Sequence, residues 1–193
     1  MVGLRGLCAA RSIERVQVYS PTPDHRMRFA ESGRAELGIE VTPCDSMEQA
    51  ISDVDIVATS TSSYKPVLRA EHLRAGVHAI GWGAPNEMDE SVFLRADQTA
   101  LFSRFLELAL HAPDPVRPNQ DPGPLHTLLA SGRVSEARLL NLGSIVAGDV
   151  AAQVGPDTIT VYRDARGGAG DAAIMKLAYE RARERGLGTE IEL

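Results

Sequence analysis

Residues 55–89 decide the fold, and they read DIVATSTSSYKPVLRAEHLRAGVHAIGWGAPNEMD. The apolar run at residues 56–58 is typical of a strand buried on both faces of a sheet, and five hydroxyl residues at 59–63 follow it directly. A second apolar run, residues 77–80, ends in GWGAP at residues 81–85. Because open α/β sheets bind ligands at the carboxyl ends of their strands, these two segments predict the floor of a ligand-binding cleft.

Length and composition limit the class of protein. The 193 residues suffice for one domain with a sizeable core, or for one domain and part of another. A net charge of -6 predicts neither a nucleic-acid partner nor an anionic membrane surface. We interpret Cys8 and Cys44, which lack zinc-site spacing, as reduced buried thiols. No membrane-length apolar run and no signal peptide are visible, so the expected compartment is cytoplasmic.

The rest of the chain alternates expected strands with expected helices. This alternation predicts an α/β fold with a parallel sheet and helices on both of its faces. The expected strands are residues 16–19, 39–42, 55–60, 77–80, 99–102 and 158–162. The expected helices are residues 2–10, 24–36, 46–52, 70–74, 89–95, 124–130 and 170–185. Between them, residues 111–124 carry five prolines, which predicts a linker or surface loop.

Glycine motifs give no clear phosphate site. A doubly wound dinucleotide fold begins with a strand and a G-x-G-x-x-G turn, and neither precedes the first expected helix here. Gly3 and Gly6 have the wrong spacing. The run GAGDAA at residues 168–173 fits G-x-G-x-x-A, but Asp171 would place a negative charge beside a phosphate. We favour a tight turn with Asp171 as the helix cap, and phosphate binding is the alternative.

Hydroxyl side chains are the candidates for ligand contacts. Thr59 and its neighbours follow a buried strand, although such residues also populate ordinary loops and helix caps. Ser20 and Thr22 stand where an acid would bind the ribose 2′-hydroxyl of NAD, and Arg26 is near enough for a 2′-phosphate. The five histidines show no metal-binding spacing, so no metal site is predicted. A G-x-S-x-G nucleophile motif is also absent from the sequence.

Four segments together resemble a known family. They are residues 13–30, 50–68, 76–91 and 158–190, and they occur in matching order. In this order they are similar to the ornithine cyclodeaminase/mu-crystallin family. The resemblance implies a Rossmann domain that binds NAD or NADP, inserted within a second domain that holds the substrate and builds a homodimer. It also implies hydride transfer to or from the carbon that bears an amino or imino group of a small amino, imino or keto acid.

The chain departs from the family pattern in two ways, and the first concerns its N-terminus. The family's substrate and dimerisation domain, its first Rossmann strand and its glycine-rich loop all precede the point where this chain begins. We therefore expect an N-terminally truncated member, with a Rossmann-like doubly wound parallel sheet that lacks its first strand and a C-terminal helical extension. The expected parts are a partial NAD(P)-binding Rossmann domain at residues 1–104, a proline-rich linker at 105–124, and at 125–193 a segment that completes the sheet and ends in a long helix.

The second departure concerns chemistry. Where many cyclodeaminases carry an acid in a G-x-D-x-P segment, this chain has Gly83, which has no side chain for acid–base catalysis. No catalytic residue is therefore assigned, and reduction of an imine or keto substrate stays open.

The favoured hypothesis is the cofactor-binding portion of an oxidoreductase, inactive as this chain alone. The alternative is a non-catalytic dinucleotide-binding module or a decayed remnant. The residues expected to contact the coenzyme are Ser20, Thr22, Thr59, Ser60, Thr61, Gly81, Trp82 and Gly83.

Overall fold

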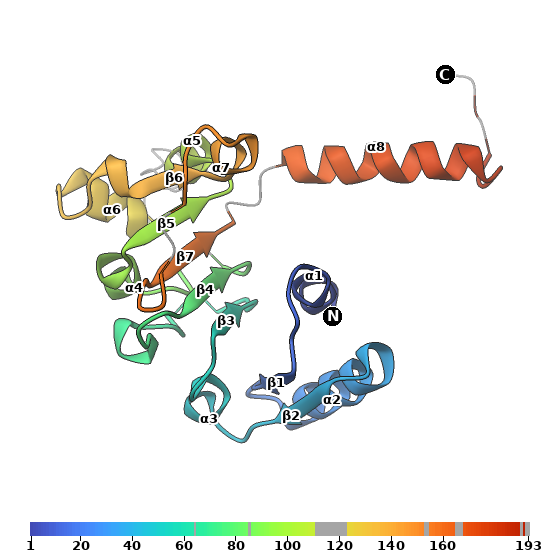
Figure 1. The fold of residues 1–193 in the computed structure, drawn as a ribbon, viewed down its shortest axis with the longest axis horizontal. Coiled ribbons are helices and arrows are strands. Elements are labelled where there is room, and N and C mark those ends of the chain that lie inside the picture. The colour runs from blue at the N-terminus through green and yellow to red at the C-terminus, as the bar shows by residue number, and fades with distance from the viewer. Residues whose placement is uncertain are drawn as a thin grey trace. The chain divides into compact units, whose positions relative to one another are not determined.

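A computed structural model describes residues 1–63, 65–84, 86–110, 123–152, 155–164, 168–189 and 191. The chain divides into two compact units, residues 1–55 and residues 56–193. Each unit has its own sheet (Figure 1).

The first unit contains a pair of parallel strands with helices before, between and after them. Its elements are α1 (Val2–Ala10), β1 (Arg15–Val18), α2 (Pro23–Leu37), β2 (Glu40–Pro43) and α3 (Met47–Ile51). β1 pairs in parallel with β2, and α2 forms the crossover between them. Gly33 of α2 faces Val41 of β2, where an added Cβ would lie 2.9 Å from Val41 Cγ2. A glycine at this position therefore allows the helix to lie close to the strand.

Local signals in the first unit match the expected helix ends. α2 begins at Pro23 directly after Thr22, and Gly38 ends it in the left-handed region with φ of 68°. The Ser46 hydroxyl accepts a hydrogen bond from Gln49 N at 3.3 Å and so caps α3. The Gln49 side chain accepts from Asp45 N and not from Ser46 N, so a reciprocal capping box is not completed.

The second unit is built on a parallel five-stranded sheet in the order β3-β4-β7-β5-β6. This topology confirms the α/β class and the parallel pairing expected from the sequence (Figure 1). β7 comes last in the chain and lies between β4 and β5, whereas β3 pairs only with β4 among the described residues. The strands are β3 (Ile56–Thr59), β4 (His78–Gly81), β5 (Gln98–Leu101), β6 (Leu139–Asn141) and β7 (Thr160–Arg163).

Helices and short turns connect these strands. They are η1 (Ala70–His72), α4 (Glu90–Arg95), α5 (Arg104–Leu110), α6 (Pro124–Ala130), η2 (Glu136–Arg138), α7 (Leu142–Ala147) and α8 (Gly168–Glu184). The Asp89 carboxylate accepts from Ser91 N at 2.9 Å and caps α4. Part of the segment expected as a linker, residues 105–110, belongs to α5, and residues 111–122 lie outside the described residues.

Two expected helices differ from the structure. Residues 70–74 form only the 3-10 turn η1, because Arg69 N donates to His72 Nδ1 and Leu73 turns into the core with 2% exposure. α8 begins at Gly168, which places Asp171 in its first turn and not at the cap position. The large apolar side chains of α8 are exposed, with Ile174 68% accessible, so α8 buries no apolar face within the described chain.

The core of the second unit lies between the sheet and its helices. Strand residues such as Ala79, Leu101 and Val161 are at most 1% exposed. Phe93 of α4 and Leu128 of α6 are buried to the same degree or nearly so, and α4 contacts α6. None of the described helices combines the length and apolar character needed to cross a lipid bilayer.

Candidate functional site

The segments that follow β3 and β4 run side by side at the same edge of the sheet. We call them the β3 loop (residues 60–63) and the β4 loop (residues 82–84). β3 and β4 are parallel, with Thr59 opposite Gly81. The pairing continues beyond the strands, since Trp82 N donates to Thr59 O and Ala84 N donates to Thr61 O, both at 2.9 Å. The structure thus brings together the two segments that the sequence predicts as a cleft floor.

A buried carboxylate joins the two loops. Glu87 is 0% exposed. Its Oε2 accepts hydrogen bonds from Thr61 N at 2.9 Å and from Thr61 Oγ1 at 3.1 Å. Its Oε1 accepts a hydrogen bond from Gly83 N at 2.6 Å. The three donors replace hydrogen bonds to water that the carboxylate loses on burial.

Gly83 has no space for a side chain. A Cβ added there would lie 2.2 Å from Glu87 Oε2 and 2.4 Å from both Thr61 N and Thr61 O. Two of these three atoms belong to the backbone, so rotation of a side chain cannot relieve the contact. The Glu87 carboxylate therefore occupies the place where a residue 83 side chain would start.

A buried guanidinium lies on the other side of the same loop. Arg163, at the end of β7, is 1% exposed, and its Nη1 donates to Gly81 O at 3.3 Å and to Gly83 O at 3.4 Å. Its Nε lies 3.8 Å from Oε1 of Glu107, which is itself 2% exposed. Burial raises the pKa of the Glu107 carboxyl above its ordinary value, although the nearby Arg163 charge acts in the opposite direction.

The expected contact residues of the second unit have different positions. Thr59 Oγ1 donates to Ile80 O at 3.3 Å, and the Thr61 hydroxyl is bound to Glu87, so both hydroxyls bind within the protein. Ser60 is exposed, and its hydroxyl has no hydrogen-bond partner among the described residues. Trp82 is half-buried. Ser60 and Trp82 are therefore the side chains of this set that stay available to a ligand.

The expected ribose-binding residues lie in the first unit, after β1. Ser20 Oγ accepts from Thr22 N at 3.4 Å. Arg26 Nη1 donates to Ser20 O at 3.2 Å, and its Nη2 lies 2.5 Å from Asp45 Oδ1. The Arg26 side chain is 14% exposed, whereas the Asp45 side chain is 88% exposed. Arg26 is thus fixed beside the backbone of Ser20.

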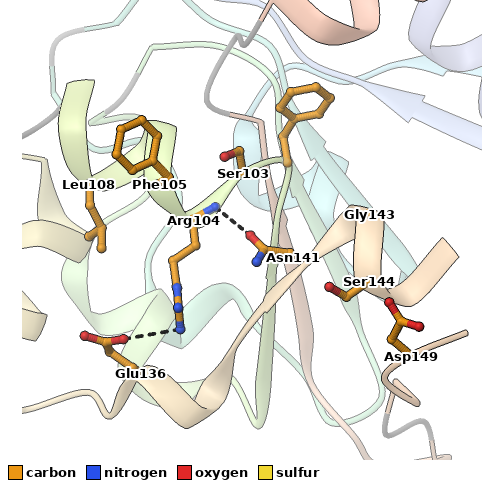
Figure 2. A pocket seen from close by; sticks show the side chains of 10 residues that line it. Ser103, Arg104, Phe105, Leu108, Glu136, Asn141, Gly143, Ser144 and Asp149 are labelled. Atoms are coloured by element: carbon orange, nitrogen blue, oxygen red, sulfur yellow. Dashed lines mark hydrogen bonds and ion pairs between the residues drawn. The ribbon is translucent and has the colours of Figure 1, made fainter. Parts of the chain in front are cut away.

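A separate open pocket of ≈ 590 Å³ lies at the carboxyl ends of β5 and β6 (Figure 2). Asn141 Oδ1 accepts from Arg104 N at 2.8 Å, and Arg104 Nη1 pairs with Glu136 Oε2 at 3.2 Å. None of the coenzyme-contact residues expected from the sequence lines this pocket. Its lining consists of Phe102, Ser103, Arg104, Phe105, Leu108, Glu136, Asn141, Gly143, Ser144 and Asp149.

Sequence reasoning missed Glu87, Arg163 and Glu107. Glu87 stands 26 residues from Thr61, so no local spacing marks their contact. Arg163 offered a weak signal, because an arginine that directly ends an apolar strand needs a partner when the strand is buried. The described residues contain no cluster of three or more histidine, cysteine, aspartate or glutamate side chains able to hold a metal ion.

Comparisons with known proteins identify the wider group. Residues 4–186 match the sequence model of the ornithine cyclodeaminase/mu-crystallin family. The Δ1-pyrroline-2-carboxylate reductase of Bacillus cereus is 30% identical over 189 residues, which cover 95% of this chain and 54% of the reductase. The chain therefore spans about half the length of this relative.

Solved structures give the same result. The Δ1-pyrroline-2-carboxylate reductase of Thermococcus litoralis, in complex with NADH and L-proline, superposes with a TM-score of 0.82 at 27% identity. That match covers 98% of this chain and 56% of the reductase. A probable ornithine cyclodeaminase from Bordetella pertussis has a TM-score of 0.72 at 26% identity, with 95% of this chain and 56% of that protein covered.

Substitution of Gly83 tests the close contact of the two loops. We expect Gly83→Ala and Gly83→Asp to lower the free energy of unfolding by about 3 kcal/mol or more, because the new Cβ displaces Thr61 and Glu87. The matched control is Gly143→Ala, since no heavy atom outside the immediate chain lies within 4 Å of a Cβ at that position. Urea unfolding of the full chain measures both effects. Wild-type stability in Gly83→Asp would contradict the contact.

The raised pKa of Glu107 predicts a pH-dependent stability. A carboxyl whose pKa is higher in the folded than in the unfolded chain binds more protons when folded, so its contribution to stability falls as pH rises. The ordinary pKa of a glutamate is 4.5, and the pKa of Glu107 in the folded chain is higher. As pH rises through the range between these two values, the free energy of unfolding of the wild-type chain should therefore fall relative to that of Glu107→Gln. Urea midpoints across that range measure the difference, and a difference that stays constant with pH would refute it.

Proposed function

Because the chain belongs to the ornithine cyclodeaminase/mu-crystallin family, we propose that it is the NAD(P)-binding portion of an oxidoreductase that acts on a small imino, amino or keto acid. The observation that carries the proposal is the side-by-side course of the β3 and β4 loops at the carboxyl edge of a parallel sheet. Open α/β sheets bind nucleotide ligands at this edge. The Thermococcus litoralis relative, which is bound to NADH and L-proline, supports the same assignment.

We assign different tasks to the candidate residues. Ser60 and Trp82 would contact the nicotinamide side of the coenzyme, because their side chains remain available at the loop edge. Thr59 and Thr61 shape the β3 loop through their internal hydrogen bonds. The backbone from Gly81 to Gly83 would allow close approach of the ring. Ser20 and Thr22 would serve the adenosine ribose.

The geometry favours reduction over cyclodeamination. Expulsion of ammonia from a diamino acid needs a group that moves protons, and Gly83 offers none at the family's acid position. Glu87 lies next to that position, but it is fully buried and bound by three donors. A bound nicotinamide would supply or accept the hydride, and this chain's residues would orient the ring.

The second candidate function is a dinucleotide-binding module without turnover. It is favoured by one observation: the carboxylate nearest to the two loops, Glu87, is enclosed by protein. Binding and turnover measured on the same preparation separate the two functions. An enzyme would oxidise NADH when Δ1-pyrroline-2-carboxylate is added, whereas a binding module would only retain the coenzyme.

Coenzyme binding can be followed with the chain's single tryptophan, Trp82, in the β4 loop. We expect NADH and NADPH to quench its emission to saturation, since the reduced ring would lie beside the indole. The dissociation constant should be weaker than about 1 µM, or about -8 kcal/mol, because the sequence contains no G-x-G-x-x-G turn for the pyrophosphate.

Trp82→Phe should abolish the quenching signal but not coenzyme binding measured by equilibrium dialysis. Absence of binding by both methods would overturn the proposed function. Binding tighter than about 1 µM would show that the pyrophosphate site lies elsewhere in the chain.

Arg26 should give NADPH the tighter binding of the two coenzymes. Its guanidinium is fixed beside Ser20, where a 2′-phosphate would lie, and Arg–phosphate pairs are strong. We expect Arg26→Gln to weaken NADPH binding about tenfold with little change for NADH. Asp45→Asn should act in the opposite direction, because it removes the carboxylate that competes for Arg26. Equal effects on both coenzymes would contradict this role.

A further inference from the structure

The peptide groups of Gly83 are held between two buried charges of opposite sign. Its N–H donates to the Glu87 carboxylate, and its carbonyl accepts from the Arg163 guanidinium. Both charged side chains are at most 1% exposed. We call these two side chains the loop clamp.

The loop clamp connects three strands of the sheet. Glu87 reaches the β3 loop through Thr61, and Arg163 extends from the end of β7 to Gly81 and Gly83 at the end of β4. Burial of a charge is unfavourable unless hydrogen bonds replace its hydration. An apolar side chain at residue 87 would leave the amides of Thr61 and Gly83 without an acceptor, so the carboxylate gives both loops directional hydrogen bonds that apolar packing would not.

We propose that Glu87 and Arg163 are positioning residues, which fix the separation of the β3 and β4 loops and thereby present Ser60 and Trp82 to the coenzyme. The effect on the coenzyme rests on the proposed function, whereas the effect on the loops does not. Glu87 occupies the amides of Thr61 and Gly83, so these donors are unavailable to a ligand. Recognition of the coenzyme at this edge then depends on the side chains of Ser60 and Trp82, which extend from backbone that the loop clamp holds in place.

Amide hydrogen exchange, measured by NMR on the full chain without coenzyme, tests the effect on the loops. A glutamine has one acceptor oxygen where a carboxylate has two. In Glu87→Gln, one of the two amides, Thr61 or Gly83, should therefore keep its protection while the other exchanges about tenfold faster. In Glu87→Ala both amides should exchange faster. Glu90→Gln is the matched control, because the Glu90 carboxylate pairs with Arg133 and not with a residue of either loop.

The pattern across the sheet distinguishes positioning from general stability. Positioning predicts that amides of β5 and β6 keep their wild-type exchange rates in Glu87→Gln. A uniform increase over all strands would show a purely structural role and overturn the proposal, as would unchanged protection at both Thr61 and Gly83. Where Glu87→Ala fails to fold, Glu87→Gln and Glu90→Gln still decide between these outcomes.

A coenzyme titration then tests the link to function. Emission of Trp82 should give a dissociation constant for NADH about tenfold weaker in Glu87→Gln than in the wild-type chain, and unchanged in Glu90→Gln. Wild-type affinity in Glu87→Gln, together with faster loop exchange, would overturn the positioning role. If the wild-type chain binds no coenzyme, the proposed function fails, and the exchange experiment still decides whether the clamp holds the loops.

Discussion

The parallel pairing of β3 with β4 is the constraint on which the candidate site depends. It places Thr59 opposite Gly81, and two further backbone hydrogen bonds extend the pairing into the loops. Because the loops approach each other so closely, residue 83 has no room for a Cβ. The same closeness allows one carboxylate, that of Glu87, to reach amides on both loops. Strand register thus determines which residue types the site can contain.

The buried side chains of the loop clamp, Glu87 and Arg163, lose their hydration and gain hydrogen bonds within the protein. Three donors bind Glu87, and none of them is a cation, so backbone amides and a hydroxyl replace its hydration. Arg163 donates hydrogen bonds to the carbonyls of Gly81 and Gly83. Its Nε also lies 3.8 Å from Glu107, whose pKa is raised by burial. Directional hydrogen bonds lose strength when a loop shifts, whereas apolar contacts tolerate small shifts. Hydrogen bonds of this kind therefore favour one conformation of the two loops over slightly shifted conformations.

Sequence patterns predicted the strands β3, β4, β5 and β7 and several helix ends, but they did not predict β6. Apolar runs marked β3 and β4, and the expected helix at residues 124–130 matches α6. The expected helix at residues 70–74 was wrong because tertiary burial of Leu73 outweighed local helix propensity. The loop clamp could not be predicted, since its hydrogen bonds join residues as far as 82 positions apart. Such contacts depend on strand order, which local spacing does not specify.

The glycine at position 83 also bears on the kind of reaction the site can assist. A C=N group that is protonated on nitrogen is already activated toward hydride, so its reduction needs no proton donor in the β4 loop. A ring closure that expels ammonia needs proton transfers at each stage, and a glycine cannot perform them. An acid introduced at residue 83 would collide with Thr61 and Glu87. The hydrogen bonds between the loops and an acid at this position therefore compete for the same space, which supports the proposal of reduction.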